Sequence, residues 1–564
     1  MNHLFKLALV AGTLALSVLL SLNTFQPSSA RSQTAGSEAF PAERAMKHVE
    51  TIARNTHPVG SPEQKEAREY IVDALKTLGL KPEVQRGHGE NDEQGFMGLV
   101  PYSGELENIY ARLKGSGNTN QSILMLAHYD STLGGPGAAD DVSGVAVLLE
   151  TARALSKTPL RNDIVFLFTD GEEAGLLGSK LFADNSGALN DVCLVMNFES
   201  RGYKDSSILF ETSDGNGWLM KEFKKAVPYH PMAYSFTSDI YKMVSNITDF
   251  TTFKSAGKSG FNFSNLGGME VYHNPQDTAE NLDPGFLQHQ GTYALSLAKH
   301  FGNIALDNVK SDHNAVYFTL TKSLMVLYPE EWTVPLTILS LILFLVTLWI
   351  GLRKRLLSLR GIITGFLASL LMIAAAAGFG IIAQTVFLKI YYKLENVLSL
   401  SDLVNLRRTI VLQGNTWMII SLILSFVILF ILQRLLANKI AGYNLLFGNL
   451  VTWLILTVFS TICLPGAGYI FLWPLIVSLA ALLIEFLIGR VTGPQNLILF
   501  LFSTFTCVLI YVPVAYLLFQ ALTMMGAGIP IAVLSLPAGV VLFTASLFIG
   551  GEKTTVAGVE YKNV

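Results

Sequence analysis

The sequence has little charge and few cysteines for its 564 residues. Charged residues make up 15% of the chain, against about 25% in ordinary soluble domains, while hydrophobic residues make up 51%. This balance excludes a wholly soluble protein. The 40 basic and 43 acidic residues give a formal net charge of -3, so the chain lacks the basic surplus typical of a nucleic-acid-binding protein. The three cysteines, at 193, 463 and 507, are too few for a disulfide scaffold and are predicted to be buried apolar residues.

Most of the charge precedes residue 330, which divides the chain into a polar part and an apolar part. We predict an N-terminal signal anchor or signal peptide at 1–30, a globular domain at 40–305, a transmembrane domain of about seven helices at 330–552 and a short tail at 553–564. The apolar run at 5–22 is predicted to direct export of the globular domain. It reaches the ~17-residue minimum for a membrane span, which favours a retained helix, although small residues at 28–30 also suit a signal peptidase.

Seven apolar runs after residue 330 are each long enough to cross a bilayer. Basic residues lie in the turn at 353–360, at Arg434 and Lys439, and at Arg490, whereas the turns at 464–468 and 521–528 have none. Positive turns favour the cytoplasm, so the globular domain is predicted to be extracytoplasmic: periplasmic or on the outer face in a bacterium, luminal in a eukaryote. The region 387–415, taken as an external loop, conflicts with this rule because it contains four basic residues. The predicted spans are 334–351, 361–386, 416–433, 444–463, 469–489, 496–520 and 529–550.

The globular part alternates helical and strand patterns, as an α/β domain does. Ser61, Pro62 and Gln64 predict a capped start for an amphipathic helix that ends at Gly79. The runs at 122–128, 164–170, 192–198 and 207–212 are short and continuously apolar, which is typical of strands covered on both faces. We therefore predict an αβα sandwich followed by a multi-pass helical membrane domain.

Polar side chains come directly after these runs at the carboxyl ends of the predicted strands, where an open α/β sheet places its active site. The segments are LMLAHYDS, AADDVSG, FLFTDGEEAGLLGS, VMNFESRG and the later VYHNPQDT. A single histidine or a pair of acids in a loop is more often solvated surface. Several of them beside a hydrophobic sheet need a neutralising charge, which a pair of divalent ions supplies.

The ligand types fit two zinc ions that share one carboxylate. Asp140 is predicted to bridge the ions. His128 and Glu199 complete the first ion, and Glu173 and His273 complete the second.

Two further acids receive roles in catalysis. Glu172 stands beside a ligand but is not needed as one, so it is predicted to be the general base that takes a proton from a metal-bridging water as the hydroxide attacks. Asp130, two residues after His128, is predicted to accept a histidine ring N–H and so fix its tautomer.

Together these motifs resemble the cocatalytic dizinc exopeptidases of the bacterial leucyl aminopeptidase type, in particular the membrane branch that contains the vacuolar membrane protease and the endoplasmic reticulum metallopeptidase. The resemblance covers about 45–305 and implies the same ligand set, base and supporting aspartate. It also implies a mixed, mostly parallel sheet and a cis peptide after Asp140. Glu199 stands where many soluble aminopeptidases have aspartate, which leaves the substrate class more open.

The leading hypothesis is a membrane-anchored zinc aminopeptidase that acts on peptides outside the cytoplasm. A glutaminyl-cyclase-like aminoacyltransferase that uses one zinc ion is the first alternative, but the Val-Ser-Gly after Asp141 resembles the peptidase form. A non-catalytic, peptidase-derived binding ectodomain is the second alternative. Such relatives lose metal ligands, whereas this sequence retains all five together with the base. The sequence implies a peptide substrate and a lipid bilayer as partners, and leaves residue specificity and oligomeric state open.

Overall fold

The computed structural model describes residues 3–91, 102–185, 187–243, 247–391, 400–488, 496–550, 555–556 and 559–560. They form two compact units, Thr24–Pro329 and the combination of Met1–Asn23 with Glu330–Val564. Most of the predicted tail at 553–564 lies outside the described residues. Within it, β10 (Thr555–Val556) pairs antiparallel with β11 (Val559–Glu560).

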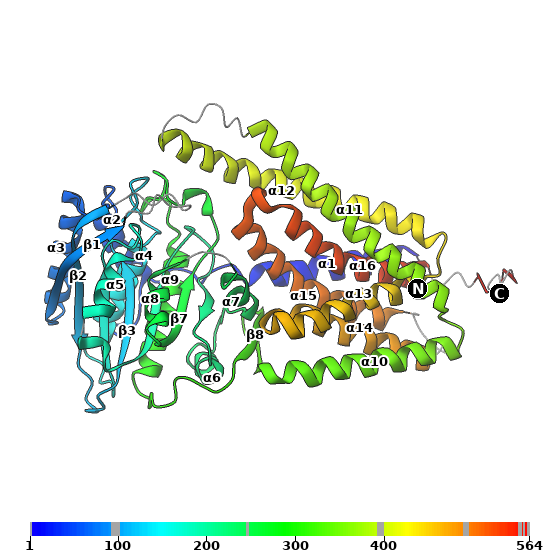
Figure 1. The fold of residues 1–564 in the computed structure, drawn as a ribbon, viewed down its shortest axis with the longest axis horizontal. Coiled ribbons are helices and arrows are strands. Elements are labelled where there is room, and N and C mark those ends of the chain that lie inside the picture. Colours follow the sequence, from blue (N-terminus) through cyan, green and yellow to red (C-terminus); the bar gives the residue numbers. More distant parts are fainter. Residues whose placement is uncertain are drawn as a thin grey trace. The chain divides into compact units, whose positions relative to one another are not determined.

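The globular unit is built on one seven-stranded mixed sheet with helices on both faces (Figure 1). Its strands are β1 (Pro82–Asn91), β2 (Tyr102–Leu113), β3 (Ser122–His128), β4 (Asp163–Thr169), β5 (Val192–Phe198), β6 (Ile208–Thr212) and β7 (Ser259–Ser264). The order is β1-β2-β4-β3-β5-β7-β6. The pairs β4–β3, β3–β5 and β5–β7 are parallel, and the outer pairs are antiparallel. The predicted mixed α/β sandwich is confirmed.

The central strand β3 is apolar from Ile123 to Ala127 because each of its faces meets a separate core. Ile123 and Met125 pack into one core, and Leu124 and Leu126 pack into the other. The first core contains side chains of α2 (Ala42–Ile52), α3 (Pro62–Thr77), α4 (Val142–Leu155), α6 (Gly217–Ala226) and α9 (Pro284–Phe301). The second contains side chains of α8 (Asp249–Ser255) and α5 (Leu177–Asn185). Burial on both faces removes the alternating pattern of a half-exposed strand.

The predicted start of α3 is confirmed, with one difference. Ser61 is the N-cap and accepts the N–H of Gln64 at 3.1 Å, and Pro62 takes the first helical position. The Gln64 side chain returns to the N–H of Gly60 at 2.8 Å, and not to that of Ser61, and it also contacts the Asp170 carboxylate. The cap therefore ties the start of α3 to the end of β4.

The unit also contains α7 (Ser235–Tyr241), which packs on β6, and a hairpin of β8 (Ala315–Thr321) and β9 (Leu324–Pro329). Short 3-10 turns lie at Gly187–Leu189 and Met269–Val271 in this unit, and at Glu330–Trp332, Pro465–Ala467 and Thr523–Gly526 in the other. The sheet brings the carboxyl ends of β3, β4 and β5 to one edge because these strands are parallel neighbours.

The second unit is a bundle of long apolar helices. They are α1 (His3–Asn23), α10 (Thr333–Arg353), α11 (Leu359–Tyr391), α12 (Leu400–Ala437), α13 (Gly442–Cys463), α14 (Tyr469–Ile488), α15 (Leu497–Leu522) and α16 (Gly528–Gly550). Among the described residues, eight helices are long and apolar enough to span a membrane, one for α1 and one for each predicted run. The region 387–415 is not simply a loop, because α11 continues to Tyr391 and α12 begins at Leu400.

Helix α1 packs along one side of this bundle, against α15 and α16. Leu9 and Val10 lie against a cluster that includes Phe500 of α15 and Phe548 of α16. The buried residues of α1 are the small polar Thr13, Ser17 and Ser21, spaced four apart, and small residues allow membrane helices to approach closely.

The helix ends that carry basic residues lie together at one end of the bundle. Lys354 at the end of α10 donates to the carbonyl oxygen of Phe486 at the end of α14 at 2.5 Å. The N–H of Ser358 donates to Asn444 at the start of α13 at 3.0 Å, and Tyr443 beside it donates to Asn496 before α15 at 3.0 Å. Asn496 in turn donates to the carbonyl oxygen of Leu547 in α16, and Lys6 of α1 donates to that of Ile549.

Candidate metal centre

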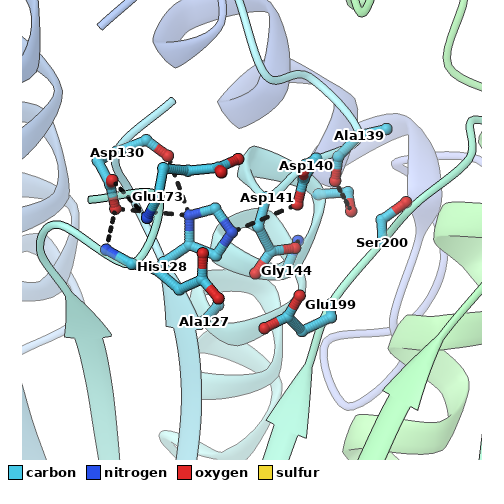
Figure 2. Close-up of polar contacts among 12 residues, drawn as sticks. Ala127, His128, Asp130, Ala139, Asp140, Asp141, Gly144, Glu173, Glu199 and Ser200 are labelled. Atoms are coloured by element: carbon cyan, nitrogen blue, oxygen red, sulfur yellow. Dashed lines mark hydrogen bonds and ion pairs between the residues drawn. The ribbon is translucent and has the colours of Figure 1, made fainter. Parts of the chain in front are cut away.

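The predicted ligands meet at the carboxyl edge of the parallel strands (Figure 2). His128 ends β3, Glu173 follows β4 and Glu199 follows β5. Asp140 lies in the loop before α4, and His273 lies in the loop after the 3-10 turn at Met269–Val271. Figure 2 shows the His128 ring between Asp130 and Asp140, with Glu199 beside it.

These side chains form two groups that share Asp140. In one group the ligand atoms of His128, Asp140 and Glu199 lie within 4.8 Å of one another, and in the other those of Asp140, Glu173 and His273 do. The Nε2 of His128 is 3.3 Å from one Asp140 oxygen, and the Nε2 of His273 is 3.1 Å from the other. The two oxygens of Asp140 therefore face two different histidines, as a bridging carboxylate requires.

Asp130 lies where the sequence predicts, with its carboxylate beside the His128 ring, but the carboxylate makes its shorter contacts with backbone N–H groups. The Nδ1 of His128 is 2.9 Å from the backbone oxygen of Asp130 and 3.5 Å from its carboxylate. The carboxylate accepts the N–H groups of Glu172 at 3.0 Å and Glu173 at 3.1 Å. The backbone of Asp130 thus orients His128, while its side chain positions the turn that carries the predicted base and one ligand.

The loop that carries Asp140 is held by Asp277, a residue the sequence interpretation did not single out. The Asp277 carboxylate accepts the N–H of Ala139 at 2.6 Å and that of Asp140 at 3.2 Å. The peptide between Asp140 and Asp141 is cis, as the family resemblance implied, and the Asp141 side chain caps α4 by accepting the N–H of Gly144 at 3.2 Å. Asp277 lies within the quoted VYHNPQDT segment, but a lone acid in a turn carries no signal of this role.

Glu199 and His273 are held by different means. Asn197 donates to Glu199 at 3.1 Å and to Asn262 at 3.0 Å, which fixes the Glu199 carboxylate. His273 has a left-handed backbone with φ of 54°, which is uncommon for a residue other than glycine and occurs at functional sites. A Cβ added at Gly135 would lie 2.1 Å from the backbone oxygen of Asn274, so the Gly-rich loop needs glycine there to approach the His273 segment.

The protein's own groups leave this site short of positive charge. Burial raises the pKa of Glu199 to about 7, and burial together with the Glu199 charge raises the pKa of Glu172 well above its usual value. Burial alone would lower the pKa of His273, but the charges of Glu173 and Asp140 raise it to about 9. These buried carboxylates have too little positive charge around them to stabilise their ionised form. Together with the two imidazoles, they form a donor set that suits divalent zinc.

The geometry leaves Glu172 with two open roles. Its carboxylate lies within 4.8 Å of ligand atoms of His128 and Glu173, so it is close enough either to bind a metal ion or to exchange a proton beside one. Each predicted ion already has three protein ligands when Asp140 is shared, which favours the proton-transfer role. Metal analysis of substituted proteins separates these roles.

Further buried polar residues surround the centre, and the sequence interpretation missed them. Asp170 accepts the N–H of Glu107 at 2.7 Å, and burial raises its pKa to about 7. Asp249 contacts the hydroxyl of Thr169 beneath the 172–173 turn. Arg201 follows Glu199 by two residues and lies over the Tyr272 ring, which stacks on His273 with ring centroids 3.8 Å apart. Isolated acids and arginines are common in loops, so only the folded arrangement reveals them.

Residues 108–298 match the family model described as peptidase family M28. The chain is 30% identical over 322 residues to the putative endoplasmic reticulum metallopeptidase 1 of Schizosaccharomyces pombe, which covers 52% of this chain and 38% of that protein. It is 26% identical over 306 residues to the vacuolar membrane protease of Vanderwaltozyma polyspora, covering 51% of this chain and 32% of that protein.

Among solved structures, an aminopeptidase from Aneurinibacillus sp. strain AM-1 aligns with a TM-score of 0.39 and 17% identity, over 49% of this chain and 98% of that one. The chain spans well under half the length of the curated relatives it matches. The family and membrane relatives predicted from the sequence are confirmed.

Proposed function

We propose that this chain, whose residues 108–298 belong to peptidase family M28, is a membrane-bound zinc peptidase that holds two zinc ions and removes residues from the amino ends of peptides. The observation that carries the proposal is the sharing of Asp140 by two groups of ligand atoms, each with its own histidine and its own glutamate. The aminopeptidase activity rests on the resemblance of the sequence motifs to the leucyl aminopeptidase type.

Each residue then has a distinct task. Bound zinc would polarise the scissile carbonyl and lower the pKa of a water molecule. His128, Glu199, Glu173 and His273 would hold the ions on either side of Asp140. Glu172 would take the proton from the attacking water and pass it to the leaving amine, as a buried carboxylate with a raised pKa can do near neutral pH.

Metal analysis of the purified full-length protein tests the proposal. We expect two zinc ions per chain, loss of activity with a chelator and recovery with zinc. Hydrolysis should be seen with aminoacyl substrates and be lost when their amino end is blocked. Full activity with one zinc ion per chain would contradict the dinuclear centre and favour a glutaminyl-cyclase-like transferase. Two bound ions without turnover of any substrate would favour a non-catalytic ectodomain.

We also propose that the catalytic unit lies outside the cytoplasm. The bundle end that carries Lys6, Lys354 and the start of α13 gathers the basic turns, and positive turns favour the cytoplasm. The catalytic unit is joined to the bundle at the other ends of α1 and α10, at Asn23 and Thr333. The peptide substrates would then be extracytoplasmic, periplasmic or luminal.

Labelling of single cysteines with a membrane-impermeant thiol reagent in intact cells tests this orientation. Cys463 is exposed, which contradicts the prediction that all three cysteines are buried, and the other two are at least partly buried, so all three are replaced first. A cysteine at Gly115, in the catalytic unit, should be labelled from outside, and one at Ser358, in the basic turn, should not. Labelling at Gly115 only after the membrane is permeabilised would refute the orientation.

A further inference from the structure

Arg201 is held in a fixed position beside the candidate metal centre. Its backbone N–H donates to the backbone oxygen of Asn265 at 3.2 Å, and the neighbouring Ser200 hydroxyl donates to the Asn265 side chain at 2.6 Å. Gly202 packs on Gly267 so closely that an added Cβ would lie 2.0 Å from a backbone oxygen. The loop after β5 therefore sets the place from which the Arg201 side chain extends.

The guanidinium of Arg201 has no polar partner among the described residues. No ion pair or side-chain hydrogen bond joins it to any of them, and its one contact is with the face of Tyr272, 5.6 Å from the ring centroid. The residue is mostly but not fully buried, so a ligand can reach it. Arginine carries five N–H donors in a planar fork that matches a carboxylate, and a mostly buried arginine is normally paired.

The position of the guanidinium relative to the ligands indicates which carboxylate it meets. The rings of His273 and Tyr272 are stacked 3.8 Å apart, and the guanidinium lies on Tyr272, so it is one side-chain layer beyond a predicted metal ligand. These two distances put the guanidinium carbon no more than about 9 Å from the His273 ring. One residue of extended peptide spans about 3.5 Å and a hydrogen bond adds about 3 Å, so a carboxylate that follows the scissile bond by one residue can meet the guanidinium within that distance.

We propose that Arg201 forms a carboxylate-binding subsite next to the metal centre, and that the substrates are dipeptides whose free α-carboxylate binds there. This inference rests on the proposed peptidase function and narrows its substrate class. Arg201 is a specificity residue in this account, and Tyr272 provides the apolar face against which the guanidinium is held.

The test compares a dipeptide, Leu-Gly, with its C-terminal amide on the zinc-loaded full-length protein. The wild-type kcat/KM should favour the acid by about 10- to 100-fold, because a charge-assisted pair is lost with the amide. Arg201→Met should remove this preference mainly by raising KM for the acid, and Arg201→Lys should restore part of it. Lys204→Met is the matched control, since it removes a positive charge from the same loop but from a side chain that is 43% exposed and pairs with Glu270. The Lys204→Met variant should prefer the acid over the amide as strongly as the wild type does.

Binding measured without turnover provides an independent readout. In a Glu172→Gln background, calorimetry should show that Arg201→Met weakens binding of Leu-Gly by about 10- to 100-fold with zinc content unchanged. Equal effects of Arg201→Met on the acid and the amide, or no preference in the wild type, would overturn the subsite. If no peptide is cleaved by the wild type but Leu-Gly still binds through Arg201, the subsite stands and the proposed peptidase function fails.

Discussion

Substitution of Asp130 by asparagine should weaken the binding of one metal ion more than that of the other. The buried carboxylate of Asp130 accepts the N–H groups of both Glu172 and Glu173, one with each oxygen. Asparagine offers one oxygen and one NH2 group, so one buried N–H loses its acceptor. The shorter contact to Nδ1 of His128 comes from the Asp130 backbone oxygen at 2.9 Å, which the substitution retains, while the carboxylate lies 3.5 Å from that nitrogen. The damage should therefore fall on the 172–173 turn and spare His128.

The size of the effect follows from the lost hydrogen bond. Leaving a buried donor unpaired costs about 1–3 kcal/mol, which corresponds to about 5- to 150-fold in affinity for the ion that Glu173 holds. Turnover should also fall because Glu172 shares the displaced turn. Competition with a chelator of known affinity, followed by counting the ions retained per chain, measures the two sites separately.

A surface substitution serves as the control. Asp73→Asn removes an exposed carboxylate of α3, whose side chain is 75% exposed, and should change neither metal affinity nor turnover. The reasoning is refuted if Asp130→Asn releases the ion bound by His128 and Glu199 first, because Asp130 would then act through the histidine. Unchanged affinity at both sites would refute it equally.

Three further predictions address the base, the glycine loop and pH. Glu172→Gln should lower turnover by about 10²–10⁴-fold with metal content unchanged, whereas Glu173→Gln should lose metal; equal metal loss in both would make Glu172 a ligand. Gly135→Ala should reduce metal content and thermal stability because its Cβ would clash with a neighbouring backbone oxygen, while Gly36→Ala, with open space around it, should change neither. Burial raises the pKa of Asp170 to about 7, so the folded state holds this proton more tightly than the unfolded chain. That stabilisation is complete below about pH 4 and is lost as pH rises through 7, by about 4 kcal/mol at most. Asp170→Asn should flatten the fall in thermal unfolding temperature between pH 4 and 7, and a steeper fall would contradict the assignment.

The parallel strands could be predicted from the sequence because burial on both faces makes them continuously apolar. The predicted runs at 122–128 and 192–198 coincide with β3 and β5, and their ends carry His128 and precede Glu199. Strand β1 was not predicted, because its residues alternate between partial and full exposure and include two glycines. Strand β7 was missed for another reason: its polar Asn262 is buried but satisfied by Glu211, 51 residues earlier, and by Thr248, 14 residues earlier.

The supporting residues of the site could not be predicted either, because their contacts depend on the fold. Asp277, Asp170 and Arg201 act through partners that only the fold brings close, and each one alone resembles an ordinary loop residue. The Asp130 carboxylate shows the limit most clearly. Its short spacing from His128 predicts a contact with the ring, and the carboxylate does lie 3.5 Å from Nδ1, but its shorter hydrogen bonds are to the backbone of the next loop.

The packing of α1 against α15 and α16 sets an order of events during synthesis. Helix α1 leaves the ribosome before the helices that cover Leu9 and Val10, which emerge roughly 470 residues later, about 25–100 s at ordinary translation rates. Until then the stripe of Thr13, Ser17 and Ser21 has to be shielded by lipid or by the insertion machinery. The catalytic unit is translated within that interval, so it can fold while its own anchor is still unassembled. A chain that stops before α15 would carry a finished catalytic unit on a first helix without its neighbours, which is a state that membrane quality control can recognise.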